Sequence, residues 1–213
     1  MTFPLLRFLI IPGGVGSQVT VALAVTQAYE IRETNDSLWM VMNSIPRHPI
    51  VDTGPLFDFL LWQYSASSRM KTLLSKLEHL TNDSYQKSVS WYFSIAKPIT
   101  TCPEVIAEIH RHAEEKLEHR NLGGFWRFAQ GELKELRLSE ELIELVRMDG
   151  ETLFSHGPTD TALLNIALLS LSRDLNQPVF TVDRKLAGEC RRKEVRVLDI
   201  AEVLSIWQQN GSK

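Results

Sequence analysis

Four acidic residues that lie far apart in the sequence have the types and settings that divalent-metal chemistry requires. Asp52 and Asp183 each follow a short apolar run, and Asp160 immediately precedes another apolar stretch. Glu108 lies inside a segment with a helical pattern. Hard cations such as Mg²⁺ and Mn²⁺ prefer clusters of carboxylate oxygens. If the fold gathers these four side chains, they form a site suited to metal-dependent hydrolysis of a phosphodiester.

Three of these acids have a second interpretation as helix caps. Asp52, Asp160 and Asp183 all stand at or near expected helix starts, where Asp is a favoured N-cap and negative charge suits the first turn. For each residue taken singly, the sequence leaves the capping role and the ligand role open.

Glu108 is harder to explain as a cap. Thr101 and Glu104 have the spacing of a capping box, which accounts for Glu104. Glu108 lies one turn further into the same helix, where a carboxylate gains little from capping. Solvent exposure is its ordinary alternative, because most charged helix residues face water.

Short apolar strands alternate with helices from residue 49 onward, which predicts a parallel sheet covered on both faces. We therefore expect an α/β fold, a three-layer α/β/α sandwich with a central, mostly parallel sheet and extra helices. Ligands of such sheets bind beyond the carboxyl ends of the strands, where Asp52 and Asp183 are expected to lie. Strands are expected to end at Asp52 and to cover 98–100, 179–182 and 195–198, with helices over 56–65, 68–80, 103–120, 162–173, 184–192 and 201–207.

Glycines and polar residues indicate where the expected helices begin and end. Gly123-Gly124 predicts the end of the helix over 103–120. The segment 125–148 predicts one or two amphipathic helices, the second of them beginning at Ser139. The segment 81–84 is expected to be a polar turn.

The domain organisation that we expect is simple. Residues 1–48 form an N-terminal extension of unassigned role, 49–207 form the main domain, and 208–213 form a polar, frayed tail. Within the extension, 5–11 predicts a strand. The stretch 17–31 fits either a helix or a strand.

Composition narrows the class of protein. The chain has 213 residues, a 44% hydrophobic share, a formal net charge of −3 and a pI of about 6.1. This balance argues against a protein that holds nucleic acid mainly through a strongly basic surface. Cys102 and Cys190 match no zinc spacing and fit reduced thiols. No uninterrupted apolar stretch could span a bilayer, so we expect a cytoplasmic protein with no membrane partner.

Five short motifs, in this order, resemble those of the PIN-domain ribonucleases. The resemblance covers about residues 49–207. Each motif alone is weak, but five in the family's order are specific. The motifs are Ile-Val-Asp-Thr-Gly-Pro-Leu around Asp52, Val-Ile-Ala-Glu-Ile around Glu108, Thr-Asp-Thr-Ala-Leu-Leu around Asp160, Val-Phe-Thr-Val-Asp-Arg-Lys-Leu around Asp183, and the closing Val-Arg-Val-Leu-Asp-Ile-Ala-Glu-Val-Leu.

The resemblance implies a hydrolase, a metal-dependent endoribonuclease. It implies that Asp52, Glu108, Asp160 and Asp183 are both catalytic and metal-binding, with Mg²⁺ or Mn²⁺ as cofactor. It also implies products with a 5′-phosphate and a 3′-hydroxyl. Its partners would be an RNA substrate, a protein antitoxin if the chain is the toxin of a toxin–antitoxin pair, and a second copy in a homodimer.

Three further residues are weaker candidates. Thr181 matches a hydroxyl position that the family often places beside the metal, and an ordinary strand threonine explains it equally well. Arg184 and Lys185 directly follow Asp183 and are candidates for phosphate binding. The stretches 62–98 and 111–150 are longer than in compact toxin members of the family, which bears on substrate and role more than on fold.

Other functions fit the sequence less well. Asp52-Thr53-Gly54 is the tripeptide of aspartic proteases, but those proteins are nearly all β. Gly13-Gly14-Val15-Gly16 lacks the Lys and Ser or Thr that end a phosphate loop. The main alternative is a PIN-like fold without catalysis that serves as a nucleic-acid-binding or assembly module. Trp126, as a surface for stacking bases, is a further candidate whose ordinary role is apolar packing.

Overall fold

The computed structural model describes residues 45–67, 82–144 and 150–210. They all belong to one compact unit, Ile45–Lys213. Several expectations lie outside the described residues, namely those for 5–11, 17–31 and 68–80 and for most of the extension 1–48. The division of the chain into extension, main domain and tail stays a prediction.

A five-stranded, all-parallel sheet forms the centre of the unit, with the strand order β3-β2-β1-β4-β5. Strand β1 is central, since Ile50 pairs with Thr100 on one side and with Val179 on the other. The parallel sheet predicted from the apolar runs is therefore confirmed. The strands are β1 (Ile50–Val51), β2 (Thr100–Thr101), β3 (Ser139–Glu140), β4 (Val179–Phe180) and β5 (Val197–Leu198).

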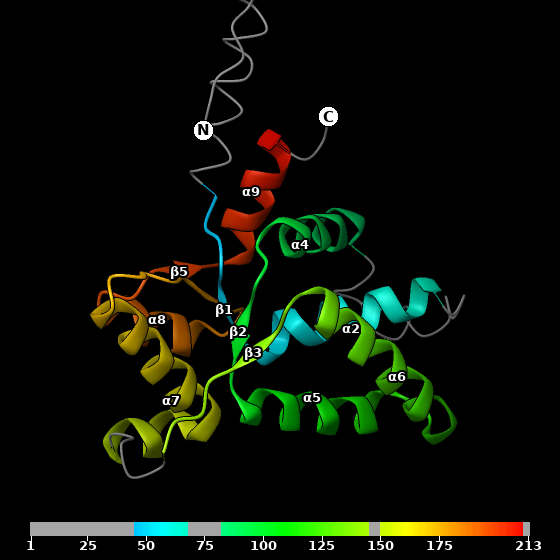
Figure 1. Ribbon diagram of the computed structural model, residues 1–213, viewed down its shortest axis with the longest axis horizontal. Helices are drawn as coiled ribbons and strands as arrows, with labels where there is room; N and C mark the ends of the chain where they lie inside the picture. Colours follow the sequence, from blue (N-terminus) through cyan, green and yellow to red (C-terminus); the bar gives the residue numbers. More distant parts are fainter. Residues whose placement is uncertain (1–44, 68–81, 145–149, 211–213) are drawn as a thin grey trace, which may run out of the picture. The chain divides into compact units, whose positions relative to one another are not determined.

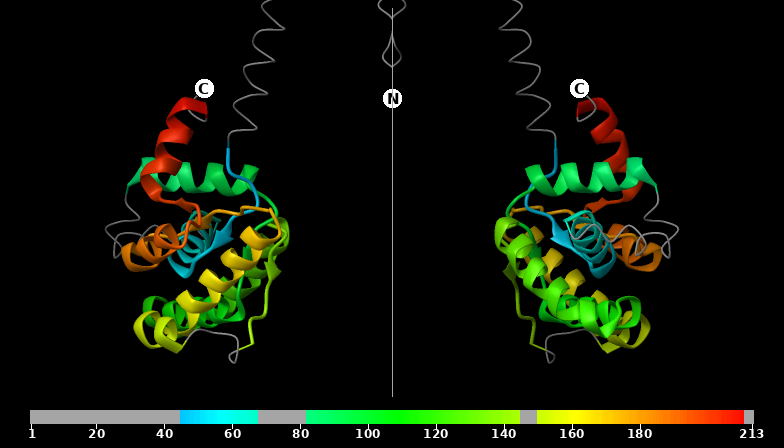
Figure 2. Two further views of the ribbon diagram at one scale, coloured as in Figure 1. Left: turned by 90° about the vertical axis from the view of Figure 1, so that its left-hand side faces the viewer. Right: turned by 90° about the vertical axis from the view of Figure 1, so that its right-hand side faces the viewer.

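Seven helices in the described part of the chain cover this sheet. Figures 1 and 2 show α4 and α9 on one side of the sheet and α5 and α7 on the other, which gives the predicted α/β layering. The helices are α2 (Thr53–Ser67), α4 (Asp83–Ile95), α5 (Pro103–Lys116), α6 (His119–Glu135), α7 (Gly150–Ser172), α8 (Arg184–Arg192) and α9 (Ile200–Asn210).

The central strands are buried on both faces, which explains their continuous apolar sequences. Ile50, Val51 and Phe180 have no exposed surface. The ring of Tyr92 packs edge-on against Phe180 with 5.4 Å between centroids, and its hydroxyl donates to the Pro46 carbonyl at 2.8 Å. Apolar contact with a satisfied polar tip thus anchors α4 to the sheet.

Helix α7 contains a break just before Asp160. Gly157 has φ 83° and ψ 175°, which lie outside the helical region, and Pro158 follows it. Only glycine adopts this conformation readily, and proline suits the first turn of a helix. Asp160 therefore lies in the first turn of the second part of α7, in agreement with the predicted helix start.

The predicted break at Gly123-Gly124 is wrong. Both glycines lie inside α6, and the chain instead leaves the helix at Leu117, which is extended and buried. A Cβ on Gly124 would lie 2.7 Å from the Tyr64 hydroxyl. Gly124 thus permits the close approach of α6 to α2, a tertiary contact that the local sequence does not reveal.

The predicted helix start at Ser139 is also wrong. Ser139 and Glu140 form the exposed edge strand β3, paired with β2. Ser139 N donates to the Ile99 carbonyl at 3.0 Å, and Glu141 N donates to that of Thr101 at 2.9 Å. This edge strand has only two residues, one of them charged, so the sequence contains no apolar run from which to predict it.

The predicted capping box of Thr101 and Glu104 does not form. Cys102 is the N-cap of α5, and it makes no side-chain capping bond. Thr101 belongs to β2, and its buried hydroxyl donates to the Val51 carbonyl of β1 at 2.8 Å. The hydroxyl binds across the sheet rather than along its own chain.

Three expected boundaries shift by a few residues. Helix α2 begins at Thr53 rather than at residue 56, and α9 continues to Asn210 into the expected tail. Helix α4 begins inside the expected turn 81–84, because the Asn82 side chain accepts hydrogen bonds from the two backbone amides of Ser84 and Tyr85. A good N-cap residue thus decides where this helix starts.

Within the described residues, no helix is both long enough and apolar enough to cross a membrane. Cys102 and Cys190 are free thiols, and both are buried.

The two glycines of α6 give a matched pair of substitutions. Gly123→Ala should raise the free energy of unfolding by about 0.5–1 kcal/mol, because alanine is the better helix former and its Cβ meets no atom within 4 Å. Gly124→Ala should be less stable than Gly123→Ala, because the Tyr64 ring must move. Urea unfolding of both variants checks the order, and equal stabilities would contradict the close approach.

Candidate functional site

All four predicted acids line one cavity of about 500 Å³, which we call the acidic pocket. Asp52 follows β1, Asp183 follows β4, and Glu108 and Asp160 come from α5 and α7. The pocket therefore lies beyond the carboxyl ends of two adjacent parallel strands, where ligands of such sheets bind. Its other lining residues are Thr53, Gly54, His112, His156, Gly157, Pro158, Thr159 and Val182.

Asp52 is the most deeply placed of the four, with 6% of its surface exposed. Its Oδ1 accepts from the Thr53 amide and its Oδ2 from the Thr181 hydroxyl, both at 2.6 Å. Burial raises the pKa of Asp52, and the charges of Glu108 and Asp183 raise it further, against the lowering effect of the two hydrogen bonds. The Asp52 carboxylate is thus fixed in position and electrostatically strained.

Glu108 is held by two hydroxyl groups from distant segments. Thr53 Oγ1 donates to Glu108 Oε2 and Thr159 Oγ1 donates to Oε1, each at 2.8 Å. Glu108 is not an ordinary helix residue exposed to solvent. Its side chain is only partly exposed, and it lines the acidic pocket. The two threonines directly neighbour Asp52 and Asp160, so Glu108 ties both acids together.

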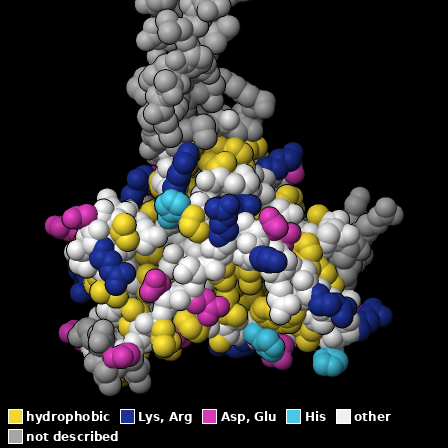
Figure 3. All heavy atoms as spheres, viewed as in Figure 1, with side chains coloured by type: hydrophobic (Ala, Val, Ile, Leu, Met, Phe, Trp, Pro, Cys, Tyr) yellow, Lys and Arg dark blue, Asp and Glu magenta, His cyan; other side chains and the backbone are white. Residues whose placement is uncertain are grey.

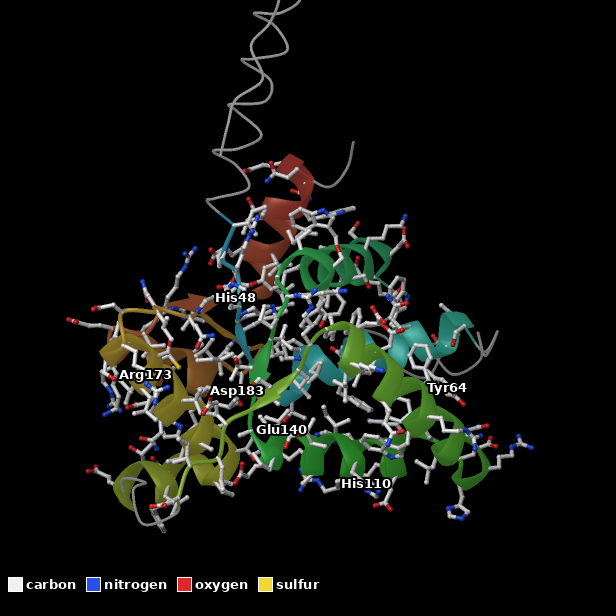
Figure 4. The ribbon with its side chains drawn as sticks, in the orientation of Figure 1. His48, Tyr64, His110, Glu140, Arg173 and Asp183 are labelled. Atoms are coloured by element: carbon white, nitrogen blue, oxygen red, sulfur yellow. The ribbon has the colours of Figure 1, made fainter. Side chains whose placement is uncertain are left out.

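Asp183 does cap a helix, as one of its two interpretations predicted. Its Oδ1 accepts from the amides of Lys185 at 2.6 Å and Leu186 at 3.1 Å, at the start of α8. Asp183 also lines the acidic pocket and is exposed there. Figure 4 shows Asp183 near the centre of the molecule, between α7 and the sheet. Capping and pocket lining are compatible, because the cap uses one carboxylate oxygen.

Asp160 lacks the support that the other three acids have. In the described part of the chain, no group donates a hydrogen bond to its carboxylate. Burial raises the pKa of Asp160 to about 7, and the charges of Asp52, Asp183 and Glu108 add to the rise, with Lys185 opposing it. Near neutral pH, Asp160 therefore exchanges a proton easily.

The hydroxyl of Thr181 joins two of the acids. It donates to Asp52 Oδ2 at 2.6 Å and accepts from the Asp183 amide at 2.9 Å. Thr181 is 1% exposed and sits between the end of β4 and the start of α8. Its position is that of a group that orients carboxylates.

The carboxylates are not arranged as a metal site as they stand. Among residues 45–67, 82–144 and 150–210, no group of three or more His, Cys, Asp or Glu side chains could hold a metal ion. Their oxygens instead face threonine hydroxyls and backbone amides. The donor set itself, four carboxylates in one pocket, suits a hard cation.

The two predicted phosphate-binding residues line different cavities, and both cavities adjoin the acidic pocket. Lys185 lines a cavity that shares His156 with the acidic pocket, and its ammonium donates to the Ser155 carbonyl. Arg184 lines another cavity, together with Arg191 and Asp199, and this cavity shares Val182 and Asp183 with the acidic pocket. On the face that Figure 3 shows, Lys and Arg side chains are dispersed among acidic and hydrophobic ones, as the pI of about 6.1 led us to expect.

Trp126 is not available as a flat surface for bases. Its ring stacks on His110, with 5.4 Å between centroids, and it packs against the hydrophobic core. Figure 4 shows His110 on α5, well away from Asp183.

Sequence reasoning missed Thr53, Thr159 and His156 as members of the site. The two threonines directly adjoin acids that had been singled out, so a hydroxyl beside a candidate ligand was a usable signal. His156 lies in a segment without any motif. It lies directly before the break at Gly157 and lines the pocket.

The fold and the site together define an α/β protein with an acidic pocket at the carboxyl edge of a parallel sheet. In comparisons with known proteins, no family model, no curated protein and no solved structure matches this chain.

Loss of the Thr181 hydroxyl should weaken the fold. Thr181→Val leaves a buried Asp52 oxygen without its donor, which should lower the free energy of unfolding by about 1–3 kcal/mol. Thr181→Ser keeps the hydroxyl and should retain most of the stability. Urea unfolding at neutral pH compares the two, and equal losses would show that the methyl group, not the hydroxyl, matters.

Asp160 should make stability depend on pH in a defined window. The folded chain holds the Asp160 proton up to pH about 7, whereas the unfolded chain releases it near 3.8. Rising pH therefore favours the unfolded chain within this window and has no further effect through this group above it. The measurement compares the free energy of unfolding of the wild type with that of Asp160→Asn, in EDTA. The difference, wild type minus variant, should decrease as the pH rises from 3.8 to about 7. A difference that rises with pH would contradict the assignment.

Proposed function

We propose that the chain is a metal-dependent endoribonuclease that hydrolyses RNA phosphodiester bonds in the acidic pocket. The observation that carries this proposal is the convergence of Asp52, Glu108, Asp160 and Asp183, from four separate segments, on one cavity at the carboxyl edge of the sheet. Mutually repelling carboxylates are costly to gather, so their convergence favours a role that needs them.

The resemblance to PIN-domain ribonucleases supports the same proposal. The four acid-bearing motifs fall where that family would use them, at two strand ends and on two helices beside them. The resemblance also supplies the expected products, a 5′-phosphate and a 3′-hydroxyl. A protein antitoxin and a homodimer remain predictions of the resemblance.

The four carboxylates fit Mg²⁺ or Mn²⁺ by their chemistry, and they would have to turn from their present hydrogen bonds to share an ion. Burial raises the pKa of Asp160, and repulsion by three neighbouring carboxylates raises it further; a cation would relieve this repulsion. When bound, the ion supplies positive charge to the phosphodiester and lowers the pKa of a water molecule. Asp52, Asp160 and Asp183 would hold it, with Glu108 as a direct or indirect ligand.

The remaining groups of the pocket position these acids. Thr181 orients the Asp52 carboxylate and receives the Asp183 amide. Thr53 and Thr159 fix the Glu108 carboxylate. The side chain of Asp160 makes no such bond among the described residues, so its oxygens are the ones best able to take a proton.

A second function is a PIN-like nucleic-acid-binding or assembly module without catalysis. The present placement of the acids favours it, since no group of them among the described residues could hold a metal as it stands. Asp183 already serves α8 as its cap. On this alternative, the acids form a structural polar network, and removing one of them would affect only stability.

Cleavage and metal binding together distinguish the two functions. With Mn²⁺, the wild type should cut single-stranded or structured RNA and show a rise in Tm, because the cation relieves repulsion among the carboxylates. Asp160→Asn should reduce cleavage by about 10²-fold or more and abolish most of the rise in Tm. Gel analysis of labelled RNA and thermal unfolding with and without EDTA measure both effects.

Asp174→Asn is the matched control, because Asp174 is an exposed carboxylate that does not line the acidic pocket. Its φ of 56° is also one that Asn tolerates. The control should cut RNA and respond to Mn²⁺ as the wild type does. No cleavage by the wild type, with a Tm that Mn²⁺ leaves unchanged, would refute the nuclease proposal.

A further inference from the structure

A second cavity, of about 590 Å³, lies between α7 and α8 and adjoins the acidic pocket. We call it the basic pocket. Figure 1 shows the two helices side by side, and His156 lines both cavities. The basic pocket is defined here by Ser155, His156, Lys185, Gly188, Arg192 and Lys193.

The helical repeat explains why these residues share a cavity. Three lining residues of α8 are spaced three or four positions apart and therefore occupy one face of the helix: Lys185, Gly188 and Arg192. The residues from α7 face them from the opposite wall. The basic residues that line the pocket are Lys185, Arg192 and Lys193, and the carboxylates among the lining residues are Glu151 and Glu189.

A buried carboxylate organises the cationic wall. The Glu189 side chain is only 4% exposed, and it forms ion pairs with Arg192 and, at 3.9 Å, with Lys193. His156 Nε2 lies 3.8 Å from Glu189 Oε2. The Arg192 and Lys193 side chains remain 73% and 40% exposed, so their charged groups are held in place and are still accessible.

The protein leaves this polar wall incompletely bonded. Among the described residues, His156 Nδ1 has no hydrogen-bond partner, although it is buried. The His156 side chain is only 10% exposed. Buried polar atoms without partners are uncommon in folded proteins and call for an explanation. A wall built only for stability would satisfy them or replace them with apolar groups.

We infer that the basic pocket binds a phosphate group of a nucleic-acid strand whose neighbouring phosphodiester lies in the acidic pocket. The location of that second phosphodiester rests on the proposed function, whereas phosphate binding in the basic pocket does not. Arg and Lys are the usual phosphate-binding side chains, and His156 lines both cavities, which are therefore adjacent. An acidic strand therefore has a cationic site next to the carboxylates that would otherwise repel it.

Gly188 allows the pocket to be filled without breaking its ion pairs. A Cβ at this exposed position meets no atom within 4 Å, so the side chain of Gly188→Leu extends into the cavity. Gly131→Leu is the matched control, because Gly131 also lies in a helix, is exposed and has the same open surroundings. Both changes introduce a better helix former, and thermal unfolding verifies that both variants fold.

The experiment measures binding of a labelled oligouridylate by fluorescence anisotropy, over a range of salt concentrations, with the full chain in EDTA. Gly188→Leu should weaken binding by roughly tenfold and reduce the slope of log K against log salt by about 0.7, the value for one phosphate contact on a single strand. Gly131→Leu should change neither quantity. Probes with a 5′-phosphate and a 5′-hydroxyl distinguish a terminal phosphate from an internal one.

Equal affinities and slopes for Gly188→Leu and Gly131→Leu would overturn the inference, and so would a wild type that does not bind the probe. These outcomes are distinct from failure of the proposed function. A chain that cuts RNA but ignores Gly188→Leu has the nuclease site without the phosphate site. A chain that cuts nothing but loses binding in Gly188→Leu has the phosphate site alone.

Discussion

The two hydrogen bonds that Glu108 accepts from Thr53 and Thr159 are the constraint on which the acidic pocket depends. Thr53 adjoins Asp52 at the end of β1, and Thr159 adjoins Asp160 after the break in α7. Glu108 therefore joins three elements that would otherwise be driven apart by like charges. Buried apolar side chains pack α5 and α7 into the core beside the sheet. The Glu108 carboxylate adds a polar link between these elements through two neutral donors, which stabilise its charge without neutralising it.

The four carboxylates differ in how many hydrogen bonds they accept, and this difference affects their protonation. Asp52 and Glu108 each accept two hydrogen bonds, and Asp183 accepts two from the start of α8. Among the described residues nothing donates to Asp160, whose pKa burial and its charged neighbours raise to about 7. The pKa values of both Asp52 and Asp160 are raised, but only at Asp52 do hydrogen bonds oppose the rise. A proton relieves the repulsion among the carboxylates at low pH, and a divalent cation would relieve it at neutral pH.

The sequence was sufficient for four of the five strands and for the acids at the sheet's edge, because both depend on local patterns. Continuous apolar runs predict buried parallel strands, and the carboxyl ends of β1 and β4 place Asp52 and Asp183 together. Tertiary contacts decided the features that were predicted wrongly. Gly124 lies inside α6 at a point where the Tyr64 hydroxyl leaves no room for a Cβ, and the Thr101 hydroxyl bonds across the sheet instead of capping α5. Strand β3 pairs with β2 through backbone bonds and both of its side chains are exposed, so its sequence has no apolar pattern typical of a buried strand.

Helix α8 contributes residues to both pockets, and its cations bear on how a chain of net negative charge could hold a polyanion. A chain with a formal charge of −3 does not attract a polyanion over long distances, so any RNA must be held by short-range contacts. At its start, α8 is capped by Asp183 of the acidic pocket, and along one face it presents the cations that Glu189 gathers. One rigid element therefore fixes the distance between carboxylates and cations. Because a helix transmits displacement along its length, a change that tilts α8 would shift both sets of charges together. Under the two proposals, the groups that would take a cation and a phosphate therefore lie on, or directly beside, the same nine-residue helix.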